Sequence, residues 1–189
     1  MIVRSKQCRL RSLLLSRITL GKVTNLPSGK NPIGCLEISR SKAGIVLNQR
    51  KYALDILSDV GFVASNPANT PMDYKLKLST AETPLIDALQ YRKLVGRLLY
   101  LTSTRPDIAF VVQRLSQFMD KPYSTHLQAA HRVLWHIKAS PGAGILFPTQ
   151  SEFQLKAFSD SDWVGWVNAR KSITSFCVFF GSALICWRA

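Results

Sequence analysis

Two carboxylates stand close together near the C-terminal end of this chain. Asp160 and Asp162 lie within AFSDSDWVGWVNARKS, at the end of a run that alternates like a strand, and Arg170 and Lys171 follow shortly after. Aspartates in such a pair can hold a divalent ion for phosphate chemistry. The same residue types also end strands and solvate turns, and the residues alone leave both interpretations open.

The charge of the chain favours a polyanionic partner. The 189 residues carry 25 Lys and Arg against 11 Asp and Glu, a formal net charge of +14. Such an excess is typical of proteins that bind nucleic acid, and less often of proteins that bind a membrane surface. A solvated basic face, or an N-terminus that is not folded, is the alternative interpretation.

The N-terminal residues 1–22 are rich in Arg and Ser and contain no acid. This composition fits an organellar transit peptide, a short basic arm or a reading of the gene out of its context. The apolar run Leu13–Leu15 is far too short to span a bilayer, so no membrane partner is expected. The four cysteines form no C-x-x-C pair and no secretory signal precedes them, which indicates an intracellular chain with reduced thiols.

Three histidines recur every five residues, at positions 126, 131 and 136. On a helix each step of five turns the next side chain by about 140°, so the three cannot converge on one metal ion. They do not form a predicted zinc site.

The first half of the chain predicts a hairpin, a helix and a connector. Residues 36–38 and 45–47 alternate as the strands of a β-hairpin. The helix that follows begins after Asn48 and ends at Gly61, where a left-handed C-terminal cap belongs. Residues 62–87 contain three prolines and little periodicity, which predicts an extended connector.

Residues 88–140 predict a unit of three amphipathic helices. Apolar side chains recur at helical spacing over residues 88–102, 106–118 and 124–139. Pro106 and Asp107 suit the first turn of the second helix, and Gly96 would permit close approach by a neighbour. Helices with short connectors bury their apolar stripes against one another.

After Pro141 the apolar periodicity changes from helix to strand. Residues 153–160, 172–180 and 184–187 predict three antiparallel strands, with a tight turn at Gly181-Ser182. The whole chain is therefore predicted to be α+β. Nothing after these strands predicts a helix to cover the sheet, so we expect an exposed sheet face and edge and poor solubility of the isolated chain.

Several blocks of sequence, in this order and spacing, resemble the Pol polyprotein of copia-type LTR retrotransposons. They are LEISRSKAGIVLNQRKYALDILSDVGF, NTPMD, YRKLVGRLLYLTSTRPDIAFVVQRLSQFM, HLQAAHRVLWHIKASPGAGILF and FSDSDWVGWVNARKSITSFCVFFGSALICWRA. The resemblance implies a divergent basic segment over 1–33, the end of the reverse transcriptase palm and connector over 34–87, a helical thumb- or connection-like unit over 88–145, and the truncated start of a ribonuclease H-like domain over 150–189.

The resemblance also implies roles for particular residues. Asp160 is similar to the first catalytic, metal-binding carboxylate of ribonuclease H, with Asp162 as a second metal ligand, and any activity would use Mg²⁺ or Mn²⁺. Arg97, Arg105, Arg170 and Lys171 are the expected contacts to an RNA–DNA hybrid or a single strand. The remainder of the polyprotein is the expected protein partner.

Catalysis by this chain alone is not expected. The Tyr-x-Asp-Asp motif of the family's polymerase is absent, and no Asp or Glu occurs between Trp163 and Ala189. We therefore expect a retrotransposon-derived fragment that is inactive alone. Two alternatives stay open: a basic nucleic-acid-binding module, and a ribonuclease H that becomes active when missing sequence completes it.

Overall fold

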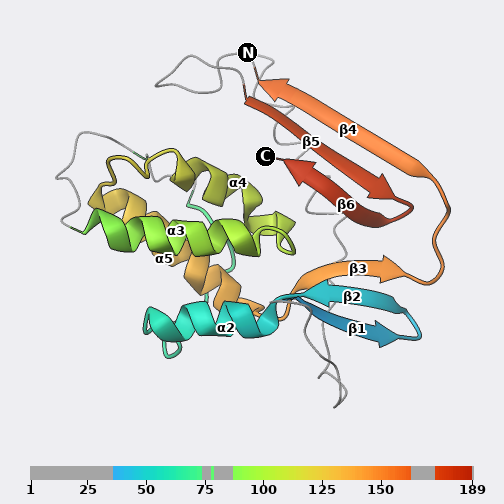
Figure 1. Ribbon diagram of the computed structural model, residues 1–189, viewed down its shortest axis with the longest axis horizontal. Coiled ribbons are helices and arrows are strands. Elements are labelled where there is room, and N and C mark those ends of the chain that lie inside the picture. Colours follow the sequence, from blue (N-terminus) through green and yellow to red (C-terminus); the bar gives the residue numbers. More distant parts are fainter. Residues whose placement is uncertain (1–35, 74–77, 79–86, 163–172, 189) are drawn as a thin grey trace.

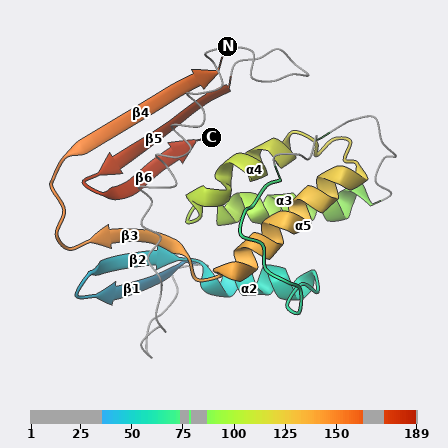
Figure 2. The same cartoon turned by 180° about the vertical axis from the view of Figure 1, so that it is seen from behind.

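The fold combines a cluster of helices with two small sheets. The computed structural model describes residues 36–73, 78, 87–162 and 173–188. In Figure 1 the helices lie together on one side and the sheets on the other, and Figure 2 shows the same arrangement from behind. The predicted α+β class is confirmed.

The first sheet pairs two strands that precede the helical region with one strand that follows it. Strands β1 (Glu37–Ser41) and β2 (Gly44–Asn48) form a hairpin with Lys42 and Ala43 at its turn, and β3 (Gly144–Pro148) pairs antiparallel with the other side of β2. The hairpin was predicted, but with shorter strands and a longer turn. Strand β3 was not predicted, because its pairing partner lies about a hundred residues earlier in the chain.

Helix α2 (Arg50–Asp59) begins and ends much as its sequence predicts. The Asn48 carboxamide oxygen accepts a hydrogen bond of 3.0 Å from the Arg50 backbone N–H in the first turn. At the other end, Gly61 has φ +74°, which is the left-handed conformation expected after a helix. Ala53, Ile56 and Leu57 face the core.

The three predicted helices are present and bury their apolar stripes together. They are α3 (Ala88–Leu101), α4 (Pro106–Ser116) and α5 (Ser124–Ala139). With α2 they enclose one hydrophobic core, in which Val95, Val112 and Val133 are fully buried. The Tyr91 hydroxyl donates a hydrogen bond of 2.8 Å to the Leu115 carbonyl oxygen and so ties α3 to the end of α4. Burial raises the pKa of this phenol.

Gly96 does not serve the close helix approach that its position in α3 suggested. A Cβ atom built at Gly96 meets no heavy atom within 4 Å, and the residue is exposed. The close approach occurs instead at Gly144 in β3, where a Cβ atom would stand 2.2 Å from the Leu47 carbonyl oxygen. Close packing therefore requires glycine at position 144 of the first sheet, and not at position 96.

The second sheet is the predicted antiparallel unit of three strands. Strands β4 (Leu155–Asp162), β5 (Ile173–Phe180) and β6 (Ala183–Arg188) pair in sequence order, with a β-bulge near Val178 and Phe179. Gly181, with φ +60°, stands in the turn between β5 and β6 as expected. Strand β6 contacts β3 and α4, so it faces the rest of the molecule, and β4 forms the outer edge (Figure 1).

Within the described residues, no helix is both long enough and apolar enough to cross a membrane.

Candidate functional site

The structure places both predicted metal-binding aspartates on the edge strand β4. Asp160 lies opposite Ser175 of β5 and is partly exposed, and Asp162 ends the strand opposite Ile173. Because side chains alternate along a strand, Asp160 shares its face of the sheet with positions 156 and 158.

These two carboxylates do not by themselves fit a site for two divalent ions. Such a site draws carboxylates from several separate elements, so that each ion bridges the scissile phosphate. Asp160 and Asp162 come from a single strand. In the described part of the chain, no group of three or more His, Cys, Asp or Glu side chains is arranged to hold a metal ion.

The predicted nucleic-acid contacts have different environments. Arg97 is partly exposed on α3, where its guanidinium lies 2.6 Å from the Asp59 carboxylate and over the ring of Tyr52. Arg105 is only 1% exposed and points into the protein. Arg170 and Lys171 lie outside the described residues. Arg97 is thus the one member of the set that the described structure places at the surface.

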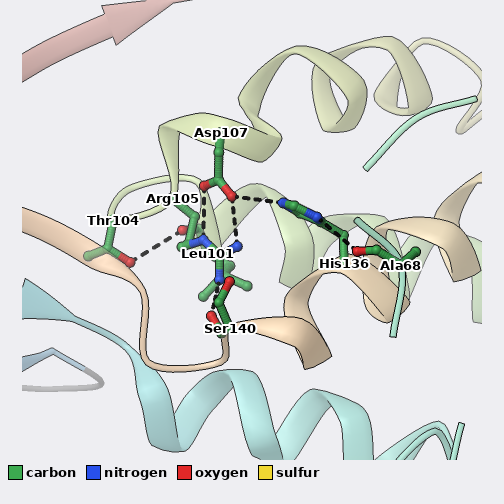
Figure 3. A network of polar contacts seen from close by, with 7 residues as sticks. All are labelled: Ala68, Leu101, Thr104, Arg105, Asp107, His136 and Ser140. Carbon is green, nitrogen blue, oxygen red and sulfur yellow. Dashed lines mark hydrogen bonds and ion pairs between the residues drawn. The ribbon is translucent and has the colours of Figure 1, made fainter. Parts of the chain in front are cut away.

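Arg105 belongs instead to a buried polar network at the start of α4 (Figure 3). Its Nε donates to Asp107 Oδ1 at 2.9 Å and its Nη2 to Asp107 Oδ2 at 2.7 Å, which makes a bidentate ion pair. Its Nη1 donates to the Ser140 carbonyl oxygen at 2.8 Å, just after the end of α5. One guanidinium therefore joins the first turn of α4 to the last residues of α5.

His136 completes the network from α5. Its Nε2 lies 3.2 Å from Asp107 Oδ2, and its Nδ1 lies 3.2 Å from the carbonyl oxygen of Ala68 in the connector. The Ala68 backbone N–H donates in turn to the Trp135 carbonyl oxygen at 3.0 Å. These bonds hold the part of the connector around Ala68 against α5.

The charges of this network govern the ionisation of Asp107. Burial by itself would raise the pKa of the carboxyl, but hydrogen bonds from Arg105 and His136 and their positive charges outweigh it and hold the pKa well below its usual range. Asp107 also stands in the first turn of α4, where the helix dipole favours a negative charge. The carboxylate is therefore ionised and paired.

The network has an acid and a histidine in contact, yet its geometry suits a structural role. A general base needs a ring nitrogen that can reach a reacting group. Here one nitrogen of His136 faces a carboxylate oxygen and the other a carbonyl oxygen, and both of these groups only accept hydrogen bonds. Neither nitrogen remains available to a substrate, so we assign the network to holding α4, α5 and the connector together.

Sequence reasoning did not find this network. The segment Arg105-Pro106-Asp107 indicates a helix start, and the spacing of His136 from the other two histidines only excludes a shared metal ion. A signal was present, because Asp107 lies two residues after Arg105 at the first turn, close enough for an ion pair. Its burial depends on Ser140 and His136, which are brought there by the packing of α5.

Comparison with known proteins identifies relatives among transposon polyproteins. The chain is 40% identical over 153 residues to the retrovirus-related Pol polyprotein from transposon RE1 of Arabidopsis thaliana, which covers 80% of this chain and 10% of that protein. It is 29% identical over 158 residues to the corresponding polyprotein from transposon TNT 1-94 of Nicotiana tabacum, covering 79% of this chain and 12% of that protein.

A shorter relative is an uncharacterized mitochondrial protein of Arabidopsis thaliana. It is 36% identical over 154 residues, which are 82% of this chain and 64% of that protein. No protein-family model matches the chain, and no solved structure matches it.

The chain belongs to the family of copia-type, retrovirus-related Pol polyproteins of transposons. It spans only about a tenth of the length of the transposon polyproteins it matches. The resemblance found in the sequence is thereby confirmed.

Proposed function

We propose that this chain is a piece of the reverse transcriptase and ribonuclease H region of such a polyprotein, without catalysis of its own. Residues 34–145 would derive from the closing part of the reverse transcriptase, and residues 150–189 from the start of ribonuclease H. The ancestral chemistry would be RNA-templated DNA synthesis and cleavage of RNA–DNA hybrids.

The order of elements is the observation that carries this proposal. A helical unit is followed directly by an antiparallel sheet whose first strand, β4, bears Asp160. Sequence similarity to transposon Pol polyproteins covers about four-fifths of the chain. Both support a fragment that crosses the boundary between the two enzymatic regions.

The number and placement of acidic residues after β3 support the proposed absence of catalysis. After β3 the chain contains three acids, Glu152, Asp160 and Asp162. Two of these belong to one strand, and Glu152 lies 3.9 Å from Lys156 just ahead of it. A two-ion mechanism needs carboxylates that surround the scissile phosphate from separate elements. This chain alone does not supply them, and Mg²⁺ or Mn²⁺ would meet at most the two ligands of β4.

A nuclease assay tests this proposal. The purified chain and its Asp160→Ala variant are incubated with a labelled RNA–DNA hybrid in the presence of Mg²⁺ or Mn²⁺. We expect no cleavage above background from either protein. Metal-dependent cleavage that is lost in Asp160→Ala would overturn the proposal and favour a working ribonuclease H.

A second candidate function is nucleic-acid binding without catalysis. The observation that favours it is a group of exposed basic side chains on the first hairpin and the start of α2, namely Arg40, Lys42, Arg50 and Lys51. Together with the net charge of +14, these side chains would attract phosphates of a hybrid or a single strand. Arg97 and the pair Arg170 and Lys171 are the further contacts that we propose.

The salt dependence of binding tests this second function. Fluorescence anisotropy with a labelled single strand should show affinity that falls steeply between about 50 and 200 mM salt, because bound phosphates release counterions. Replacing both Arg170 and Lys171 by Ala should reduce the log–log salt slope by about one to two. The matched control replaces two exposed neutral residues, Ser58 and Gln90, by Ala, and this change should leave the slope unaltered. Binding that is flat in salt would contradict the function.

A further inference from the structure

We propose that β4 is a self-association edge, through which two copies of this chain pair antiparallel and join their second sheets into one continuous sheet. The inference concerns the isolated chain and does not depend on the proposed ancestry. Three features of β4 support it: a backbone edge with no partner strand among the described residues, exposed apolar side chains and a charge pattern that matches an antiparallel copy of itself.

Strand β4 has one neighbour among the described residues. It pairs along its whole length with β5, and the sheet order puts it at the edge opposite to β6 (Figures 1 and 2). Its eight residues, LKAFSDSD, contain neither Pro nor Gly, and their pairing with β5 has no bulge. Natural edge strands are usually short, bulged or interrupted by proline, since a long regular edge offers unpaired N–H and C=O groups to another chain.

Exposed apolar side chains line the same edge. Leu155 is 66% exposed and Phe158 is 38% exposed on β4 itself, and Phe180, opposite Leu155 on β5, is 43% exposed. Phe153 precedes the strand at 92% exposure, with its ring centroid 5.8 Å from that of Phe180. Apolar surface at the edge adds a driving force to the pairing of backbone groups.

The charges on β4 select the partner. Lys156, Phe158 and Asp160 lie on one face at alternate positions. When an antiparallel second copy is centred on Phe158, Lys156 of each chain stands opposite Asp160 of the other, and the two Phe158 side chains meet between these pairs. Opposite charges and aromatic pairs at directly opposed positions both stabilise a sheet.

Other alignments of the same two strands are less favourable. A copy centred on Asp160 sets two carboxylates against each other, and one centred on Lys156 sets two ammonium groups against each other. A parallel copy in register does both. Charged residues normally protect an edge strand from pairing, and here they oppose these alignments. A copy centred on Ser159 would also set Lys156 opposite Asp162, but it would set Phe158 opposite Asp160. The copy centred on Phe158 combines pairs of opposite charge with a pair of aromatic rings. A second copy of the chain, antiparallel about Phe158, therefore fits this edge best.

The test measures dimerisation of the full chain by sedimentation over a range of concentrations. One strand pair is a small interface, so we expect a weak, concentration-dependent dimer. Lys156→Asp and Asp160→Lys each turn two attractive pairs into two repulsive ones and should raise the dissociation constant about ten-fold or more. The double variant with both changes restores opposite charges and should return to within about three-fold of the parent.

Matched controls carry the same charge changes on the exposed face of α2. Lys51→Asp and Asp55→Lys should leave the dissociation constant unchanged, and circular dichroism confirms that each variant is folded. A chain that stays monomeric at every concentration would overturn the proposal. So would a double variant that stays as weak as the single ones, because that result would exclude the alignment about Phe158 in favour of another register or another occupant of the edge.

Discussion

Asp107 supplies the counter-charge for a buried guanidinium in the helical unit. Its carboxylate is 5% exposed and neutralises Arg105, which is 1% exposed. We expect Asp107→Asn to lower the free energy of unfolding by about 3–5 kcal/mol, because it leaves a buried guanidinium without its counter-charge. Urea denaturation followed by circular dichroism measures the change.

The control for that substitution is Asp59→Asn. Asp59 also pairs with an arginine, Arg97, at 2.6 Å, but its side chain is 63% exposed. Solvent screens such a pair, so the loss should be below about 1 kcal/mol. Equal losses of unfolding free energy in Asp107→Asn and Asp59→Asn would show that burial does not determine how much these ion pairs stabilise the fold.

The low pKa of Asp107 predicts how stability depends on pH. In the unfolded chain this carboxyl titrates near its ordinary value of about 3.9. Because the folded pKa lies below that value, the stabilisation is complete above the unfolded pKa and is lost as pH falls through it toward the folded pKa. Parent and Asp107→Asn proteins should therefore differ most in unfolding free energy at about pH 5 and least at about pH 2.5.

Comparing the two proteins removes the contributions that they share. Burial lowers the pKa of His131, so charging that imidazole also destabilises the fold as pH falls, but it does so equally in both. A difference that stays constant between about pH 5 and about pH 2.5 would mean that Asp107 titrates alike in the folded and unfolded states.

Among the helices and strands, replacing Gly144 or Gly96 by Ala should change the unfolding free energy in opposite directions. Gly144→Ala places a methyl group 2.2 Å from the Leu47 carbonyl oxygen in the β2–β3 pair, so it should lower the unfolding free energy by about 1–3 kcal/mol. Gly96→Ala meets nothing within 4 Å in α3 and should raise it by about 0.5–1 kcal/mol. Thermal and urea unfolding of both variants measures the signs. Destabilisation by Gly96→Ala would instead indicate that a neighbouring element packs closely against Gly96, as the sequence suggested.

The elements that the sequence predicted are those whose signals are local. Helix α5 runs from Ser124 to Ala139, the bounds predicted from its apolar spacing and the Pro141-Gly142 break. The three strands of the second sheet alternate clearly and follow one another through the chain. Each of these signals lies within a window of about one element.

Features that depend on distant contacts could not be predicted in this way. Strand β3 has five residues, and it becomes a strand by pairing with β2 across the intervening helices. The burial of Arg105 similarly requires the end of α5 to supply the Ser140 carbonyl oxygen. The position of Asp160 on a strand was predicted, whereas the burial of the network around Asp107 follows from tertiary packing.

For the whole molecule, the hydrophobic core is divided very unequally. The core of the helical unit draws buried side chains from all four described helices. In the described part of the second sheet, the hydrophobic cluster consists of Cys177, Phe179 and Leu184, with Trp187 packed against it. Since burial of apolar area is the main stabilising term, the sheet should open at a lower free energy than the helices.

Hydrogen exchange measures this difference directly. Amides in the middle of α3, α4 and α5 should exchange only through global unfolding, whereas those of β4 and β5 should exchange through a local opening that leaves the helical core intact. Dimerisation through β4 would protect its outward amides, so the exchange should be recorded on the Lys156→Asp variant as well as on the parent. Protection of the sheet equal to that of the helices in both proteins would mean that β6, through its contacts with β3 and α4, couples the sheet to the main core in one cooperative unit.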